Sequence, residues 1–311
     1  MMMETAMEGD AGMQQQTIGR MVCCKGIGLH SGAPVSIRFR PAPANSGIRF
    51  LRQTAGRPAW VEARIGQVSG TTLATTLGRG DEVVHTVEHL LAALSGMRID
   101  NVIIELDGPE IPIMDGSARP FVEVLLEAGC VRQAAVRAVC VLDASFEVRD
   151  DTGWIAAAPA SRLEIHNTVE YDHPAVGRQV FEYIDEGPAG FAASLAGART
   201  FGFLDDVERL KAAGLILGGS LENAVVVGPH GVLNAEGLRW RDEFVRHKTL
   251  DLLGDLALFG GAVRGRITAY KAGHALHAKF TSYLAAHAEL WSLESPESRE
   301  LISVGEAVHS S

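Results

Sequence analysis

Two segments of the chain repeat apolar residues at the spacing of a helix and carry histidine and acidic residues on the other side. In the first, predicted as a helix over residues 83–94, the apolar residues fall on one face at about 100° per residue. His85 and His89 lie one turn apart on the opposite face, with Glu88 between them. A place in the apolar core is therefore excluded for these three side chains, which leaves a solvated face or a functional site.

The second segment, predicted as a helix over residues 241–258, is divided in the same way. His247, Asp251 and Asp255 follow one another one turn apart, opposite the apolar residues, and Lys248 lies beside them. A histidine and a carboxylate one turn apart can hold a metal ion, although an ordinary ladder of surface ion pairs has the same pattern. Together, the two helices indicate one shared site.

The residue types of this site favour zinc. Nitrogen and oxygen ligands without cysteine suit a catalytic zinc ion, which keeps three protein ligands and a water in the fourth position. Zinc lowers the pKa of that water to about 7, and a neighbouring carboxylate takes its proton. Glu88, beside His89, is such a carboxylate.

The order of the predicted elements indicates two domains. Strands separated by turn residues occupy residues 17–51, followed by the first helix, a strand at 101–106 and a helix near 120–128. After a join at 129–137, strands resume at 139–142, and the long helix, a strand and a last helix follow. We therefore expect a leader at 1–16, domains at 17–129 and 130–295, and a tail at 296–311.

Charge and cysteine content exclude several classes of protein. The formal net charge is -10 and no basic patch stands out, which argues against a nucleic acid partner. The four cysteines have no disulfide or metal spacing, as is typical of reduced thiols in the cytosol. No signal peptide and no apolar run of about 18 residues is found, so we expect a cytoplasmic protein without a transmembrane segment. Peripheral contact with a membrane stays open.

Motifs spread over residues 17–288 resemble the UDP-3-O-acyl-N-acetylglucosamine deacetylases. They are GIGLHSG at 26–32, RPAPAN at 40–45, TVEHL at 86–90, EIPIMDGS at 110–117, ARTFGF at 198–203, DEFVRHKTLD at 242–251 and TAYKAGHAL at 268–276. The resemblance implies an α+β fold of two similar domains, each a layer of helices packed on a β-sheet, with the active site between them. It also implies a cytoplasmic zinc amidase of the Gram-negative type that removes the N-acetyl group from a UDP-linked acylated glucosamine in lipid A biosynthesis.

The resemblance assigns the chemical roles residue by residue. It makes Glu88 the general base and His274 the cation that stabilises the oxyanion and protonates the leaving amine. Asp255 would orient His274 and hold its charge. Thr200 would donate its hydroxyl to the oxyanion, and Lys248 would lie against the zinc water and the substrate. The ligands of one zinc ion per chain would be His89, His247 and Asp251.

Substrate contacts follow from the same resemblance. Tyr171, just before Asp-His-Pro at 172–174, would stack on uracil, and Lys271 is a candidate for the diphosphate. The segment 201–227 is a β-α-β-like insertion with more apolar side chains than it can bury on itself, among them Phe201 and Phe203. The resemblance makes it a passage for the 3-O-acyl chain.

Two other functions fit part of the pattern. His85-Thr86-Val87-Glu88-His89 spells H-x-x-E-H, a signature of inverted zinc peptidases. A nucleotide-sugar binding protein without chemistry is the other alternative. The ligand types at 247 and 251 argue against the first, and the complete set of base, acid and oxyanion donor argues against the second. His85 and His277 depart from the family pattern, and we expect a monomer in which His85 does not touch zinc.

Overall fold

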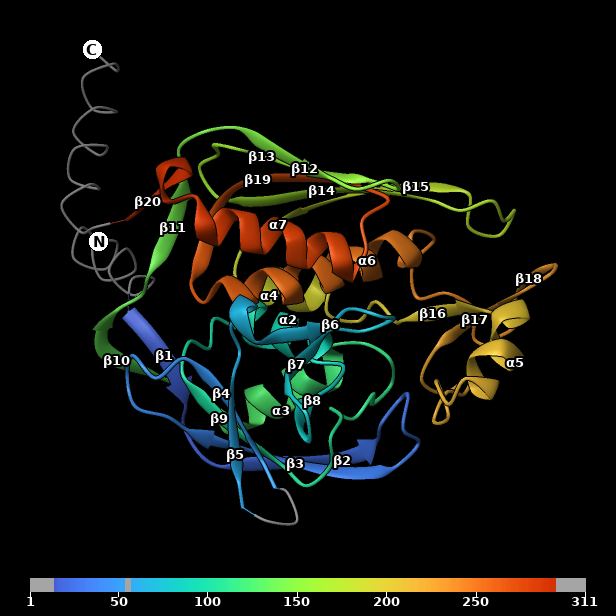
Figure 1. The fold of residues 1–311 in the computed structure, drawn as a ribbon, viewed down its shortest axis with the longest axis horizontal. Coiled ribbons are helices and arrows are strands. Elements are labelled where there is room, and N and C mark those ends of the chain that lie inside the picture. The colour runs from blue at the N-terminus through green and yellow to red at the C-terminus, as the bar shows by residue number, and fades with distance from the viewer. Residues whose placement is uncertain (1–13, 54–56, 295–311) are drawn as a thin grey trace.

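The computed structural model describes residues 14–53 and 57–294, and its elements are stacked in layers (Figure 1). At one side lies a five-stranded sheet in the order β2-β3-β9-β4-β5, with helices α2 and α3 on its inner face. Alternate residues of β3 and β9 are buried against these helices, as the period of a strand requires. The bounds are β2 Val22–Ile27, β3 Pro34–Pro41, β9 Val102–Leu106, β4 Ile48–Arg52, β5 Ala59–Glu62, α2 Glu88–Gly96 and α3 Arg119–Ala128.

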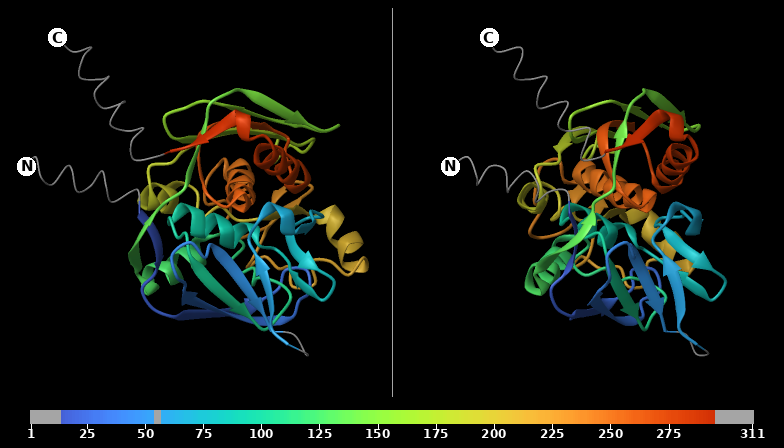
Figure 2. Two further views of the ribbon diagram at one scale, coloured as in Figure 1. Left: turned by 60° about the vertical axis from the view of Figure 1, so that its left-hand side comes forward. Right: turned by 90° about the vertical axis from the view of Figure 1, so that its left-hand side faces the viewer.

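At the other side lies a seven-stranded sheet, and helices α6 and α7 cover its inner face (Figures 1 and 2). Its main path is β12-β13-β19-β11-β20, and β14 pairs with both β19 and β15. The molecule thus runs sheet, helices, helices, sheet, and α2 contacts α6 in the middle. The bounds are β11 Val139–Leu142, β12 Phe146–Arg149, β13 Trp154–Ala158, β14 Leu163–Glu170, β15 Arg178–Ile184, β19 Ala262–Tyr270, β20 Trp291–Leu293, α6 Glu243–Leu256 and α7 His274–Ala286.

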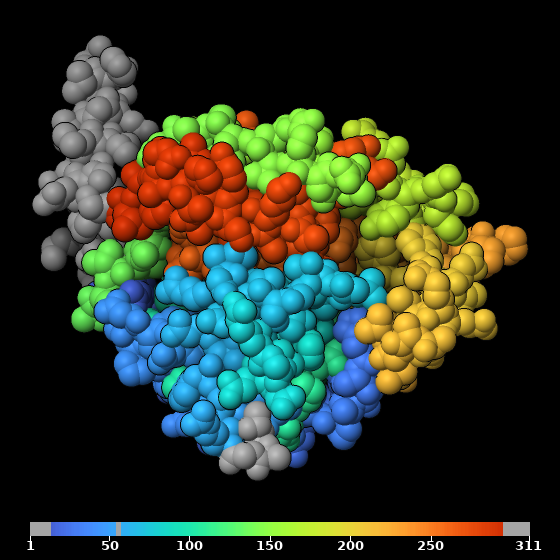
Figure 3. Space-filling view, in the orientation of Figure 1, coloured from blue at the N-terminus to red at the C-terminus, as the bar shows by residue number. Residues whose placement is uncertain are grey.

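Smaller elements connect and flank the two halves. The sequence predicted a β-α-β insertion, which is confirmed because β16 and β17 are parallel with α5 between them. The insertion stands at one side of the molecule, coloured gold in Figure 3. The remaining bounds are β1 Gln14–Ile18, η1 Ile65–Gln67, β6 Val68–Gly70, β7 Thr76–Arg79, β8 Glu82–Val84, β10 Cys130–Val136, α4 Pro188–Ser194, β16 Phe201–Phe203, α5 Leu204–Ala212, β17 Val225–Gly228, β18 Gly231–Val232, η2 Ala257–Phe259 and η3 Ala288–Leu290.

The first site helix starts later than predicted. It begins at Glu88, because Val83 and Val84 belong to β8, where β-branched side chains pack well. Thr86 has a φ of 59°, a left-handed conformation that ends any helix coming from upstream. His85 instead forms a β-bridge with Glu110. The prediction that His85 and His89 share a helix face is therefore wrong.

The ends of the chain are described only in part. Gln14–Ile18 form β1, which pairs with β10, so the first described strand begins inside the segment expected to be a leader. The rest of that segment and the expected tail at 296–311 lie outside the described residues. Within the described residues, no helix has the length and hydropathy needed to cross a bilayer.

A close approach of α2 and α6 fixes how the two halves meet. At Gly254 of α6, an added Cβ would lie 2.0 Å from the carbonyl oxygen of Glu88, so only glycine allows this contact. One cluster of buried apolar residues continues through the contact, from Ile37 of β3 to Leu284 of α7. The residues around Gly254 on α6 are thereby held beside the start of α2.

Candidate active site

Three ligand-type side chains meet where α2 and α6 touch. His89 comes from α2, and His247 and Asp251 come from successive turns of α6. Their candidate ligand atoms lie within 4.8 Å of one another. Asp251 Oδ1 is 3.5 Å from His89 Nε2 and 3.3 Å from His247 Nε2. None of the three is more than 4% exposed, so the alternatives of a solvated face and of a surface ion-pair ladder are wrong.

The chemistry of this cluster fits a metal ion. Asp251 Oδ2 accepts from Lys248 Nζ at 2.6 Å, but Oδ1 is buried without a hydrogen-bond partner, a costly state that a cation would relieve. His247 Nδ1 donates to the Ala198 carbonyl at 3.1 Å, which leaves the Nε2 lone pair for a ligand bond. Burial lowers the pKa of His247 to about 3 against the attraction of Asp251, so the ring is neutral, as a metal ligand must be.

Glu88 lies beside the cluster as a buried carboxylate. Its side chain comes from the first residue of α2, and the residue is 2% exposed. The backbone N–H of Thr75 donates to Glu88 Oε2 at 2.9 Å. Burial raises the pKa of Glu88, and the nearby His274 and His89 only partly oppose this effect. A carboxylate with a raised pKa is a stronger proton acceptor, which suits a general base.

A histidine and a carboxylate form a second group next to the first. His274, at the start of α7, donates from Nδ1 to Asp255 Oδ2 at 2.8 Å. Burial alone would lower the pKa of His274, but the charge and hydrogen bond of Asp255 outweigh it and raise the pKa to about 9. Although burial opposes it, His274 in turn holds the pKa of Asp255 below its usual range. The His274 ring is therefore a cation at neutral pH.

A cavity of about 700 Å³, the large cavity, connects these groups to the insertion. Its lining includes His89, His247 and Asp251, which we call the metal-type cluster. Glu88, His274, Thr200 and Lys248 also line it, as do Leu29 and His30 from the loop after β2. That loop holds the insertion, because Leu217 N donates to His30 O at 3.1 Å. The insertion contributes a set of apolar residues to the lining, namely Phe201, Phe203, Leu204, Val207, Leu210, Ile216, Leu221, Ala224 and Val226.

Comparison with known proteins decides the family. A family model described as UDP-3-O-acyl N-acetylglycosamine deacetylase (LpxC) matches residues 15–286. This chain belongs to the LpxC family. A curated Myxococcus xanthus (strain DK1622) protein named UDP-3-O-acyl-N-acetylglucosamine deacetylase is 46% identical over 291 residues, 94% of this chain and 92% of the relative. Proteins of the same name from Oleidesulfovibrio alaskensis and Pasteurella multocida are 48% and 41% identical, covering 90% and 94% of this chain and 91% and 97% of the relatives.

Of the residues expected to bind the UDP group, Tyr171 belongs to the described lining of the large cavity of this LpxC family member and Lys271 does not. Tyr171 lines the large cavity, and its ring centroid lies 5.6 Å from that of Phe201 and 5.5 Å from that of Phe203. Lys271 has an exposed side chain on the turn before α7, with a φ of 51°. It lies two residues from Gly273, which lines the cavity, but the described lining does not include Lys271 itself.

Two site residues of this LpxC chain received no role from the sequence. Thr75 Oγ1 donates to Asp255 Oδ1 at 2.6 Å, and nothing in its turn-rich surroundings signals this contact across 180 positions. His277 Nδ1 donates to Asp255 Oδ2 at 2.8 Å. Because His277 follows His274 by three residues in a helix, its share in the site could have been found from spacing.

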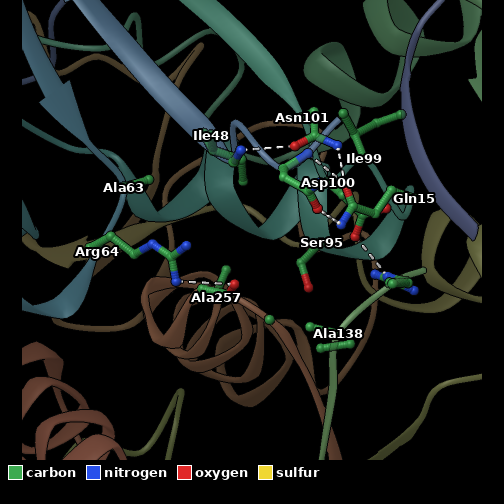
Figure 4. A pocket seen from close by; sticks show the side chains of 16 residues that line it. Gln15, Ile48, Ala63, Arg64, Ser95, Ile99, Asp100, Asn101, Ala138 and Ala257 are labelled. Carbon is green, nitrogen blue, oxygen red and sulfur yellow. Dashed lines mark hydrogen bonds and ion pairs between the residues drawn. The ribbon is translucent and has the colours of Figure 1, made fainter. Parts of the chain in front are cut away.

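A second, smaller cavity of about 240 Å³ also lies between the two halves of the protein (Figure 4). Most of its polar side chains are paired with one another or with nearby backbone groups. Asp100 accepts from Gln16 N and from Arg137 Nε, both at 2.8 Å, and Arg64 Nη1 donates to Gly260 O at 3.2 Å. Asn101 Oδ1 accepts from the backbone of Gly47 at 2.8 Å. This small cavity is a polar joint between the halves.

Proposed function

We propose that this chain hydrolyses the N-acetyl amide of UDP-3-O-(3-hydroxyacyl)-N-acetylglucosamine in lipid A biosynthesis, with one zinc ion per chain. The products would be acetate and UDP-3-O-(3-hydroxyacyl)-glucosamine. Family membership supports the substrate. The observation that carries the zinc dependence is Asp251 Oδ1, buried and unpaired between two imidazole nitrogens.

His89, His247 and Asp251 would hold the zinc ion, which supplies a Lewis acid that polarises the amide carbonyl and acidifies water. Glu88 would take the proton from the attacking water, for which its raised pKa is suited. The Thr200 hydroxyl and protonated His274 would donate hydrogen bonds to the oxyanion as the carbonyl becomes tetrahedral. When the C–N bond breaks, His274 would give its Nε2 proton to the amine, and acetate would leave.

The large cavity supports the remaining contacts. Lys248, within it, would contact the substrate, and Tyr171 would stack on uracil. Lys271, exposed close to His274, would reach the diphosphate. The apolar lining of the insertion, including Phe201 and Phe203, would bury the acyl chain. At about 0.8 kcal/mol per methylene, ten methylenes would contribute roughly 8 kcal/mol before ordering costs.

The organisation of the whole chain follows as part of the proposal. Residues 17–129 and 130–295 would be two similar domains with the active site between them, and α2 and α6 meeting at the site support this division. The free thiols of Cys23 and Cys130 are exposed, as expected in the reducing cytoplasm of a Gram-negative cell. The chain would act as a monomer that can contact the membrane surface when it takes up its acylated substrate.

Acetate release tests the proposal. Purified protein is incubated with the acylated UDP-N-acetylglucosamine, and acetate is measured before and after treatment with a chelator and after zinc is added back. We expect activity that the chelator abolishes and zinc restores. Activity that persists after the protein is shown to be metal-free would refute the zinc dependence, and no acetate from zinc-loaded protein would refute the reaction.

A further inference from the structure

Thr75 connects the two groups of the site that carry protons. It lies between β6 and β7 and is 1% exposed. Its backbone N–H donates to Glu88 Oε2 at 2.9 Å, while its hydroxyl donates to Asp255 Oδ1 at 2.6 Å. One residue therefore contacts a carboxylate on α2 and a carboxylate on α6.

The hydroxyl of Thr75 completes the hydrogen bonding of Asp255. Oδ2 of Asp255 accepts from Nδ1 of both His274 and His277, each at 2.8 Å. Among the described residues, Thr75 is the hydrogen-bond donor found at Oδ1. A carboxylate held at both oxygens cannot rotate without losing a bond, so its orientation and that of the His274 ring are fixed together.

Thr75 makes these contacts from outside the large cavity. Thr71 and Leu73 of the same segment line the large cavity, but the described lining does not include Thr75. Its side chain is therefore placed to act on other residues and not on the substrate. Loss of the hydroxyl should change turnover more than substrate affinity.

We propose that Thr75 is a positioning residue. Its hydroxyl orients Asp255 and the ring of His274, whose Nδ1 bonds Asp255 and lies 3.4 Å from Thr75 Oγ1, while its backbone amide orients Glu88. This inference rests on the proposed amidase function. The segment between β6 and β7 contains no metal-ligand or acid-base side chain, yet the proposal gives it a role in proton transfer.

Thr75→Val tests the proposal, because it replaces the hydroxyl with a methyl group of similar size and keeps the backbone amide. We expect kcat to fall by about tenfold to a hundredfold, with KM changed by less than about twofold, and Thr75→Ser to restore kcat. Thr76→Val is the matched control. It makes the same change one residue further on, where the hydroxyl contacts His85 Nδ1 at 2.9 Å instead of the site.

NMR of protein labelled with ¹⁵N-histidine gives a second readout, which does not require turnover. The Nδ1–H signals of His274 and His277 report their hydrogen bonds to Asp255. Both should shift in Thr75→Val and stay in place in Thr75→Ser and Thr76→Val. If the wild-type protein released no acetate, the proposed reaction would fail while these signals still tested the role of Thr75.

Three results would overturn the positioning role: unchanged kcat in Thr75→Val, unshifted histidine signals in that variant, or a loss in Thr75→Ser as large as in Thr75→Val. A rise in KM that accounts for the whole loss would also overturn it. Thr75→Ala removes the hydroxyl with less bulk and is measured in the same way if Thr75→Val does not fold.

Discussion

The large and the small cavity lie between the same two halves of the protein but treat their polar groups in opposite ways. In the small cavity, Asp100 and Arg137 bond each other, and Arg64 bonds backbone carbonyls. In the large cavity, Asp251 Oδ1 is buried without a hydrogen-bond partner. Unpaired buried groups cost free energy, so they persist where a ligand or a reaction uses them. The unpaired carboxylate oxygen, and not the cavity volume, therefore distinguishes the candidate active site in the large cavity from the structural contact in the small cavity.

Removing one of the proposed metal ligands should cause the largest loss of function. We expect His89→Ala to lose bound zinc and nearly all turnover, because only two of the three proposed ligands would remain. His85→Ser is the control, since the His85 ring bonds Thr76 Oγ1 and lies outside the metal-type cluster. It should keep one zinc ion per chain and most of the activity. Metal analysis showing the reverse would favour the H-x-x-E-H ligand set.

Removing the proposed base, Glu88, should leave the proposed zinc ion bound. Glu88→Gln keeps an oxygen that can accept from Thr75 N but cannot take a proton from water. We expect turnover to fall on the order of 10² to 10⁴-fold, with zinc content unchanged. Elemental analysis and acetate release on the same sample measure the two effects. A variant that loses zinc and activity together would show that Glu88 acts through the metal site.

The apolar part of the large cavity can be tested with the substrate itself. UDP-N-acetylglucosamine without the 3-O-acyl chain should lose at least about a hundredfold in kcat/KM, because the methylenes would no longer be buried against the insertion. Both substrates carry the same amide, so the comparison isolates the chain. Equal efficiencies would remove the insertion from substrate binding.

The pH profile should report the His274 cation. Because the pKa of His274 is raised to about 9, the protonated acid is present at neutral pH and is lost as the pH rises through about 9. Activity should therefore fall on the alkaline side by about tenfold per pH unit. His274→Gln should be slow at all pH values and lack this alkaline limb. An identical limb in His274→Gln would assign it to another group.

The smallest effect on activity is expected in the small cavity. Asp100→Asn weakens the bonds from Gln16 N and Arg137 Nε, so we expect the free energy of unfolding to fall by about 1–3 kcal/mol. Turnover should stay within about twofold, since the joint holds the halves without touching the reacting groups. Chemical denaturation and acetate release measure the two quantities. A large loss of kcat in a stably folded variant would make the small cavity part of the site.

Sequence periodicity predicted α6 and its row of ligand-type residues well because a long helix imposes one spacing throughout. It failed at the start of α2, since Val83 and Val84 fit a helical pattern equally well but pair in β8. Two residues before α2 contact Glu110, His85 through a β-bridge and Thr86 through its hydroxyl, and no local pattern reveals these contacts. Long-range hydrogen bonds such as that from Thr75 to Asp255 likewise require the tertiary structure.

The division of the ligand-type residues between α2 and α6 has a consequence for synthesis of the chain. During translation, His89 emerges from the ribosome long before His247 and Asp251 are synthesised. A nascent or truncated chain that ends before α6 therefore contains only one of these three residues. Metal affinity in such sites arises with folding. The ion would then bind late, after α6 has been synthesised and has folded against α2. Truncated chains without α6 would not bind it tightly.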